Sequence, residues 1–166
     1  MNYGRLNKHD IANGTGVRVS LFVSGCRNRC KGCFQPETWS FNYGEPFTLK
    51  TMFEIEDALD QKHIDGLTIL GGDPFEPENI ETVTAICETV YKWCPGKSIW
   101  IYTGYLYEDL KDLEIMRYID VLVDGRFIEE LKDISLKFRG SSNQRIIDVP
   151  ASLKSGEVKL WEVKND

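Results

Sequence analysis

Residues 17–33 have the sequence VRVSLFVSGCRNRCKGC, an apolar run followed by three cysteines at the spacing C-x3-C-x2-C. The run alternates at first and then becomes continuously apolar, which predicts a buried parallel strand. Three thiolates within eight residues, Cys26, Cys30 and Cys33, can hold three corners of a cubane iron–sulfur cluster. The fourth iron would then have no protein ligand and would be open to a substrate.

Zinc is the alternative metal for this loop. A structural zinc ion normally has four ligands, often supplied as two separated pairs. The other cysteines and histidines have no second half-site beside them: His9, His63, Cys87 and Cys94. Bacterial ferredoxins use a different spacing, which supplies four thiolates. The spacing favours a cluster with three protein ligands, and zinc stays open as an alternative.

The composition is that of one ordinary folded domain, residues 1–166, with 42% hydrophobic and 28% charged residues. A formal net charge of −6 argues against a surface for nucleic acid or anionic membrane. The sequence shows no signal-like segment at its start and no apolar run of membrane-spanning length, so we expect a cytoplasmic protein. In that compartment clustered cysteines more often bind metal than form disulfides.

Strand and helix patterns alternate along the chain. Further strands are predicted at 67–70, 98–102, 119–123 and 144–149, with a short sixth at 158–161. Amphipathic spacing predicts helices at 49–60, 77–93 and 106–116, and a short helical or irregular piece at 127–136. Cys87 and Cys94 fall on the apolar stripe of the second helix, which predicts that they are core residues.

Strands that alternate with helices at this spacing imply β-α-β units and a parallel sheet. Five or six strands are too few for a closed barrel of eight, so the sequence predicts an α/β fold with a partial parallel β/α barrel. Functional sites in such sheets lie at the carboxyl ends of the strands. The cysteine loop and three further loops follow predicted strands: Gly71-Gly72-Asp73-Pro74, Thr103-Gly104 and Asp124-Gly125-Arg126. We expect these loops to meet at one rim.

The Gly71-Gly72-Asp73-Pro74 turn permits close backbone approach to a ligand, because two residues without a Cβ atom end the strand. The Asp73 carboxylate or neighbouring carbonyls can accept hydrogen bonds from a ligand ammonium group. An ordinary strand-to-helix turn explains the same residues when they are taken alone.

These motifs resemble those of the radical S-adenosylmethionine (SAM) superfamily. The three-cysteine spacing is similar to its cluster motif, and Gly71-Gly72-Asp73-Pro74 is similar to its glycine-rich, acid-ended motif for the methionine amino group. A closer resemblance, from about residue 2 to residue 145, is to the family of proteins that activate anaerobic ribonucleoside-triphosphate reductase. The segments that carry it are 21–26, 71–74, 102–105, 121–127 and 139–145.

The resemblance implies a fold of the radical SAM type and a 4Fe-4S cluster on Cys26, Cys30 and Cys33, with SAM bound to the open iron. An electron from the cluster would cleave SAM to methionine and a 5′-deoxyadenosyl radical. That radical would take a hydrogen atom from a backbone glycine of the partner, the anaerobic ribonucleoside-triphosphate reductase. The protein would contribute orientation and exclude side reactions.

The resemblance also implies which residues contact SAM. Gly32, Cys33 and Phe34 would line the nucleoside end, and Gly72 with Asp73 the methionine end. Two positions depart from the superfamily pattern. An aromatic residue commonly precedes the third cysteine, where this chain has Gly32, and Asp73 replaces a glutamate of longer reach.

Charged residues on the same rim have two interpretations each. Asp124 and Arg126 would either bind the ribose or carboxylate of the cofactor or brace the strand end as an ion pair. Arg27, Arg29 and Lys31 make the cysteine loop basic in an acidic protein. They are either a solvated surface or a docking site for an acidic electron donor such as flavodoxin, since complementary charge raises association rates.

Overall fold

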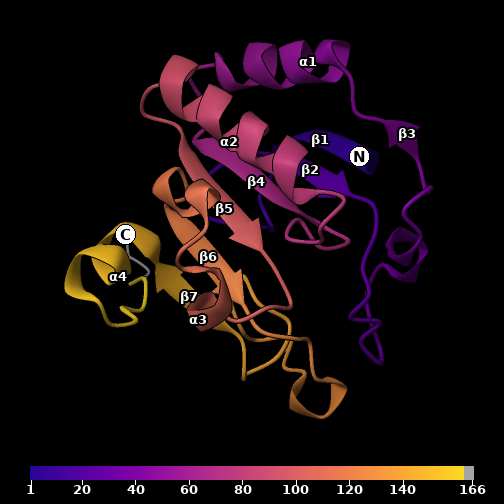
Figure 1. Cartoon of the computed structure of the whole chain (residues 1–166), viewed down its shortest axis with the longest axis vertical. Coiled ribbons are helices and arrows are strands. Elements are labelled where there is room, and N and C mark those ends of the chain that lie inside the picture. The colour runs from indigo at the N-terminus through magenta and orange to yellow at the C-terminus, as the bar shows by residue number, and fades with distance from the viewer. Residues whose placement is uncertain (163–166) are drawn as a thin grey trace.

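The computed structural model describes residues 1–162 and shows helices packed against a seven-stranded sheet (Figure 1). In sheet order the strands are β3 (Glu45–Pro46), β1 (Asn2–Asp10), β2 (Arg18–Val23), β4 (Gly66–Gly71), β5 (Ser98–Tyr102), β6 (Val121–Asp124) and β7 (Arg145–Asp148). The α-helices are α1 (Leu49–Leu59), α2 (Ile80–Trp93), α3 (Tyr107–Leu110) and α4 (Val149–Ser155). Three short 3-10 helices are η1 (Pro36–Trp39), η2 (Glu114–Arg117) and η3 (Glu129–Leu131). No helix in the described range has both the length and the apolar character to cross a membrane.

The middle of the sheet is parallel and its edges are antiparallel. Strands β2, β4, β5 and β6 pair in parallel, in the order in which they follow one another along the chain. Strand β1 runs antiparallel to β2 and β3, and β7 runs antiparallel to β6. The predicted α/β class is confirmed, with a parallel centre of four strands. The expectation of five or six parallel strands is wrong, because the chain reverses direction at both edges.

Two predicted elements are shorter than their sequence patterns. The helix predicted over 106–116 is split into α3 and η2, because Leu113 between them has an extended backbone. The strand predicted at 158–161 is a single bridge from Leu160 to β7. The piece predicted as helical or irregular at 127–136 contains η3.

Strand β1 and helix α4 carry no clear signal in the sequence, and neither do the short elements β3 and η1. Strand β1 is half-exposed and has few apolar residues, so its position is set by backbone pairing with β2. Helix α4 begins at Val149, where the sequence predicts the end of a strand. Asp148 caps this helix by accepting a hydrogen bond from the Ala151 N–H at 2.9 Å, and Pro150 occupies its first turn.

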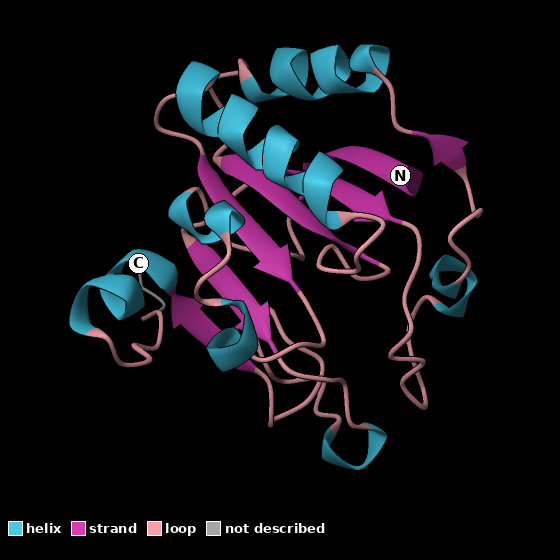
Figure 2. Ribbon diagram, viewed as in Figure 1, coloured by secondary structure: helices cyan, strands magenta, loops and turns pink. Residues whose placement is uncertain are grey.

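The sheet has one face covered by helices. Figure 2 shows α1 and α2 lying together over this face. Val19, Leu21 and Val23 of β2 join the helices in the main hydrophobic core. Cys87 of α2 is fully buried in this core, which confirms its prediction as a core residue. Cys94, at the end of α2, is only partly buried and packs against the core from its edge.

The opposite face is more polar and is organised around Arg18. Alternate residues of a strand point to opposite faces, so Arg18 lies on this side of β2. Its guanidinium is fully buried and donates five hydrogen bonds, to Thr68 Oγ1 (2.6 Å), Thr15 O (3.2 Å), Ser98 Oγ (3.0 Å), Leu67 O (2.8 Å) and Ser98 O (2.9 Å). These contacts fasten β2, β4 and β5 together at their amino-terminal ends and leave the carboxyl ends for the site.

Candidate functional site

A cavity of about 560 Å³ opens at the carboxyl ends of the parallel strands. Its volume is within the range of roughly 300–1,000 Å³ that is usual for small-molecule sites. Six residues indicated by the sequence come together on its wall: Cys26, Cys30, Cys33, Phe34, Gly72 and Asp73. Gly32, Asp124 and Arg126 are next to lining residues in the chain but do not line the cavity themselves.

The cysteine loop and the glycine loop after β4 are fastened to each other through their backbones. The Asp73 N–H donates to the Gly25 carbonyl at 2.8 Å, and the Gly72 N–H donates to the Val23 carbonyl at 2.7 Å. A Cβ atom at Gly72 would lie 2.5 Å from the Gly25 carbonyl oxygen, so this contact requires glycine. The sequence predicted that the backbone of this turn comes close to a ligand. In the structure it comes close to the backbone of the cysteine loop.

The Asp73 carboxylate is buried and accepts four hydrogen bonds. The donors are Thr103 Oγ1 (2.8 Å), Gly104 N (2.9 Å), Phe75 N (3.0 Å) and Asn28 Nδ2 (2.9 Å), two on each oxygen. Burial raises the pKa of Asp73 to about 6, so the group is mostly ionised at pH 7. Because both oxygens already accept two hydrogen bonds each, the carboxylate orders the rim.

Asn28, inside the cysteine loop, joins three sides of the rim. Its amide nitrogen donates to Asp73, and its Oδ1 accepts from Arg126 Nε at 3.1 Å. Its backbone carbonyl accepts from Arg126 Nη2 at 3.2 Å. A Cβ atom at Gly104 would lie 2.3 Å from the Asn28 amide nitrogen, so the neighbouring loop is shaped around this side chain. Arg126 therefore holds the cysteine loop and does not pair with Asp124 as the second interpretation expected.

Glu76 and Asn79, which follow the glycine loop, also fix the cysteine loop. Glu76 is fully buried and accepts from the Arg27 backbone N–H at 2.7 Å and from its guanidinium at 2.6 Å. The Asn79 amide donates to the carbonyls of Ser24 and Asp73, both at 3.0 Å. Sequence reasoning missed Asn28, Glu76 and Asn79. Polar residues at a loop or helix start are common as caps, so their identity alone gives no distinct signal.

Asp124 braces the end of β6. The side chain is fully buried, and its carboxylate accepts from the Tyr107 N–H at 2.8 Å. It also accepts from Arg145 through Nε at 3.0 Å and Nη2 at 2.5 Å, while Arg145 makes a second ion pair with Glu108 at 2.8 Å. Of the two roles weighed for Asp124, this geometry favours the brace, although with Arg145 as partner.

We expect Asp124→Asn to lower the free energy of unfolding by roughly 2–3 kcal/mol, because an amide NH2 would face a buried donor. The affinity of the cavity for a ligand is expected to be unchanged, because Asp124 does not line the cavity. Urea unfolding and a titration with SAM, the ligand that the sequence resemblance implies, measure the two quantities. Weaker binding at unchanged stability would instead assign Asp124 to the ligand site.

The aromatic surface beside the third cysteine comes from Phe34 and Phe127. Gly32 has a φ of +73°, a backbone conformation that other residues rarely adopt, and a Cβ atom there would lie 2.8 Å from Glu129 Oε1, so an aromatic residue at this position would strain the backbone and displace the Glu129 side chain. The Phe34 ring packs on Phe127 with a centroid distance of 5.0 Å, and Lys132 Nζ lies 5.1 Å from the centre of the Phe34 ring. The chain thus places its aromatic group on the other side of Cys33.

Ion pairs neutralise most of the basic charge of the cysteine loop. Arg27 and Lys31 each pair with two carboxylates, Glu76 and Glu78 for the first, Glu129 and Glu130 for the second. Arg29 makes no ion pair with any residue from 1 to 162, and its guanidinium lies 6.0 Å from the centre of the Trp39 ring. An acidic partner approaching this loop would therefore meet far less free positive charge than the sequence suggests.

The three thiols of the cysteine loop lie on one wall of the cavity, where Cys26, Cys30 and Cys33 are free and half-buried. Each thiolate of a cubane cluster binds a different iron, so three thiolates on one wall are compatible with such a cluster. Burial raises the pKa of the Cys26 thiol. Because a cysteine that binds metal does so as a thiolate, Cys26 would have to lose its proton on ligation.

The chain matches known proteins along most of its length. Residues 12–147 match the family model described as a 4Fe-4S single cluster domain. The chain is 43% identical over 146 residues to the anaerobic ribonucleoside-triphosphate reductase-activating protein of Enterobacteria phage T4, which covers 88% of this chain and 93% of that protein. The proteins of the same name from Escherichia coli (strain K12) and Haemophilus influenzae are 43% and 44% identical over 148 and 150 residues. These alignments cover 87% and 88% of this chain, and 96% and 97% of those proteins. The chain therefore belongs to the family of anaerobic ribonucleoside-triphosphate reductase-activating proteins, whose members it matches along nearly their whole length.

Proposed function

We propose that this protein is the activase of an anaerobic ribonucleoside-triphosphate reductase, a radical SAM enzyme that installs a glycyl radical on its partner. The main support for the proposal is that one cavity brings together five of the predicted residues. They are Cys26, Cys30, Cys33, Gly72 and Asp73. The names of the relatives support the choice of partner. When bound, the reduced cluster and SAM supply a 5′-deoxyadenosyl radical that takes hydrogen from a glycine.

The chain's own residues hold and orient these groups. Cys26, Cys30 and Cys33 are the ligands we assign to the cluster. We assign Gly72 and Asp73 to the methionine end of SAM. Four hydrogen bonds to the Asp73 carboxylate fix the loop, and we propose that backbone carbonyls of the turn receive the ammonium group.

The nucleoside end of SAM is assigned to Gly32, Cys33 and Phe34. Support comes from the position of the Phe34 ring, which lines the cavity and packs on Phe127 with a centroid distance of 5.0 Å. An aromatic face of this kind packs well against a planar base. Gly32 contributes by leaving room for the Glu129 side chain beside the loop.

We also propose that the sheet is an open partial barrel within a single domain. Strands β2, β4, β5 and β6 lie in chain order, and α1, α2 and α3 contribute to one core on one face. A sheet wound in one direction with its helices outside is the arrangement of a β/α barrel. The inner face is then free for a cavity at the carboxyl ends of the strands.

For the electron donor we propose flavodoxin or a similar acidic protein, and for the compartment the cytoplasm, which is reducing enough for free cysteines. Arg27 and Lys31 are held in ion pairs, so the donor would contact Arg29 and the surface around it. Reversing the charge of Arg29 should lower the rate of cluster reduction and weaken its salt dependence. An unchanged rate would remove this loop from the donor's docking site.

The glycyl radical itself tests the function. The protein is reconstituted anaerobically with iron and sulfide, reduced, and mixed with SAM and the anaerobic reductase. We expect an electron paramagnetic resonance signal of a glycyl radical on the reductase and 5′-deoxyadenosine in solution. Deoxyadenosine without the radical would mean that another glycyl-radical enzyme or a small molecule is the substrate. If neither product forms, we would conclude that this protein binds metal or transfers electrons without SAM chemistry.

A further inference from the structure

Residues 139–144 belong to a segment that carries the resemblance to the family, and they fold into a compact loop just before β7. Gln144 Oε1 accepts hydrogen bonds from the backbone N–H groups of Gly140 at 2.9 Å and Ser141 at 3.2 Å. The Arg139 guanidinium donates to the Gln144 carbonyl at 2.6 Å. We call these residues the 139–144 loop. Its own side chains hold its backbone in one shape.

The 139–144 loop holds the backbone of the segment that leaves β6. Gln144 Nε2 donates to the Gly125 carbonyl at 3.0 Å, and Asn143 Nδ2 donates to the Arg126 carbonyl at 2.8 Å. Two neighbouring side-chain amides thus bind two neighbouring carbonyls. The backbone of Arg126 is thereby fixed by a residue that lies 17 positions further along the chain.

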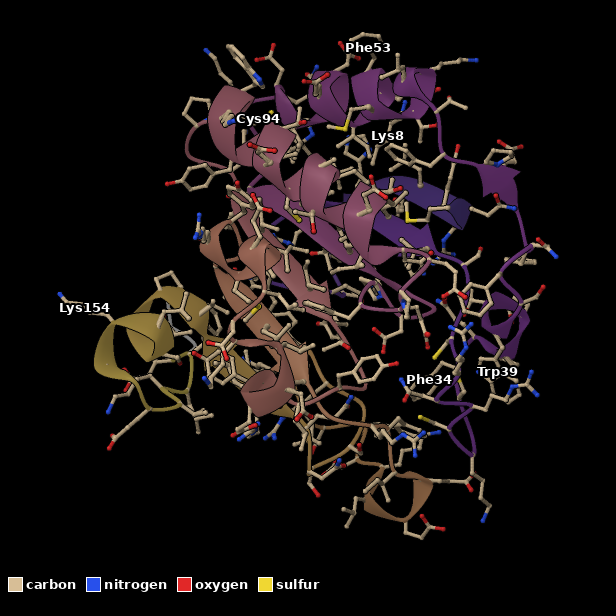
Figure 3. All side chains as sticks on the ribbon, in the orientation of Figure 1. Lys8, Phe34, Trp39, Phe53, Cys94 and Lys154 are labelled. Carbon is tan, nitrogen blue, oxygen red and sulfur yellow. The ribbon has the colours of Figure 1, made fainter. Side chains whose placement is uncertain are left out.

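The same loop supports the next two residues, Phe127 and Ile128. Ser141 is fully buried, and its Oγ accepts from the Ile128 N–H at 3.2 Å. A Cβ atom at Gly140 would lie 3.0 Å from the Phe127 ring and 3.1 Å from the Phe34 ring, so the Gly140 backbone packs directly against this aromatic pair. Figure 3 shows Phe34 at the end of the molecule away from α1, which the segment after β6 also reaches. Each of the four residues after β6 is therefore held from one loop.

The residues held in this way contact the cysteine loop on two sides. Arg126 donates to the side chain and to the backbone carbonyl of Asn28, inside the cysteine loop, at 3.1 Å and 3.2 Å. Phe127 packs on Phe34, which directly follows the cysteine loop, with a centroid distance of 5.0 Å. A continuous chain of contacts therefore runs from the 139–144 loop to the cysteine loop. Coupling between separate parts of a protein is carried by contiguous contacts of this kind.

We infer that the 139–144 loop positions the cysteine loop, and that Asn143 is a positioning residue that acts through Arg126. Neither Asn143 nor Arg126 lines the cavity, so both influence a ligand there only through the conformation of the cysteine loop. The effect on the cysteine loop follows from the contacts alone, whereas an effect on SAM affinity rests on the proposed function.

Asn143→Ala tests the inference in the reconstituted protein. The variant loses the donor to the Arg126 carbonyl, so we expect amide hydrogen exchange in residues 26–34 to become about fivefold faster. We expect SAM, added by titration, to bind about fivefold more weakly. Thr89→Ala is the matched control, because Thr89 Oγ1 also donates to a backbone carbonyl, that of Ala85, at 2.8 Å, but does so on α2. The control should change neither quantity.

A double-mutant cycle with Arg126→Ala shows whether Asn143 acts through Arg126. If it does, Asn143→Ala causes no further change in exchange or in SAM affinity once residue 126 is alanine. Additive effects of the two substitutions on the exchange of residues 26–34 would overturn the inference. Exchange at the wild-type rate in Asn143→Ala would overturn it as well.

Hydrogen exchange requires no SAM, so the inference and the proposed function fail in different ways. If the wild type binds no SAM, the proposed function is wrong, and the exchange rates of residues 26–34 alone decide on the inference. If the wild type binds SAM and Asn143→Ala matches it in both SAM affinity and exchange, the inference alone is wrong.

Discussion

Each of the variants Cys26→Ala, Cys30→Ala and Cys33→Ala should form deoxyadenosine only at the background rate and should lack the iron–sulfur chromophore. The reason is that a three-ligand cluster has no spare thiolate, so one lost ligand leaves an iron exchangeable and the cluster unstable. Neither of the other two cysteines is placed to replace the lost ligand, because Cys87 is buried in the core on the helical face of the sheet and Cys94 packs against that core. Iron and sulfide analysis with an anaerobic assay measures both effects.

Cys87→Ala is the matched control for these variants. Cys87 is fully buried, and burial alone raises the pKa of its thiol, as expected for a small core side chain. We expect this variant to keep its cluster and turnover and to lose about 1 kcal/mol of stability. Loss of cluster in Cys87→Ala to the same extent as in Cys30→Ala would contradict the assignment of ligands.

Arg18→Met should lower the free energy of unfolding by about 3–5 kcal/mol, which is a large share of the stability of a domain of this size. The guanidinium satisfies acceptors on β4, β5 and the turn before β2. A methionine side chain would fill most of the volume of the arginine. It would leave the buried carbonyls of Leu67 and Ser98 without the hydrogen bonds that Arg18 donates to them. Urea unfolding of the protein measures the loss.

Arg18→Lys separates geometry from charge at this position. Burial lowers the pKa of Arg18 to about 10, so the group is charged at neutral pH, and the burial penalty stays constant between pH 6 and pH 8. A lysine keeps the charge but its single ammonium cannot reach acceptors on both strands. We therefore expect Arg18→Lys to be nearly as unstable as Arg18→Met throughout this pH range. A lysine variant with wild-type stability would show that charge alone matters here.

The centre of the fold could be predicted because buried parallel strands are continuous apolar runs with glycine-rich ends. β2, β4 and β5 are of this kind. The edges could not be predicted in the same way. β1 is half-exposed and polar, and β7 has a strand pattern that contains no information about its direction. The antiparallel pairing of β7 with β6 follows from the chain returning without a crossover helix, which only the structure shows.

The candidate site could be predicted in its cysteines and glycines but not in its supporting side chains. Spacing alone indicates Cys26, Cys30 and Cys33. Asn28 contacts partners 45 and 98 residues away, and such distant pairings leave no local pattern. For the same reason an ion pair of Asp124 with its neighbour Arg126 was one of the two interpretations of these residues, whereas the carboxylate binds Arg145 from the next strand. Proximity in the sequence therefore does not predict which charged side chains pair at the rim.

We propose that Cys26, Cys30 and Cys33 hold a four-iron cluster with one open iron that binds SAM. Mössbauer spectroscopy of protein reconstituted with 57Fe tests it most directly. We expect about four irons per chain, and we expect the addition of SAM to change the spectrum of one iron while the other three stay as they were. A spectrum that SAM leaves unchanged, or a protein that retains zinc and no iron, would contradict the claim.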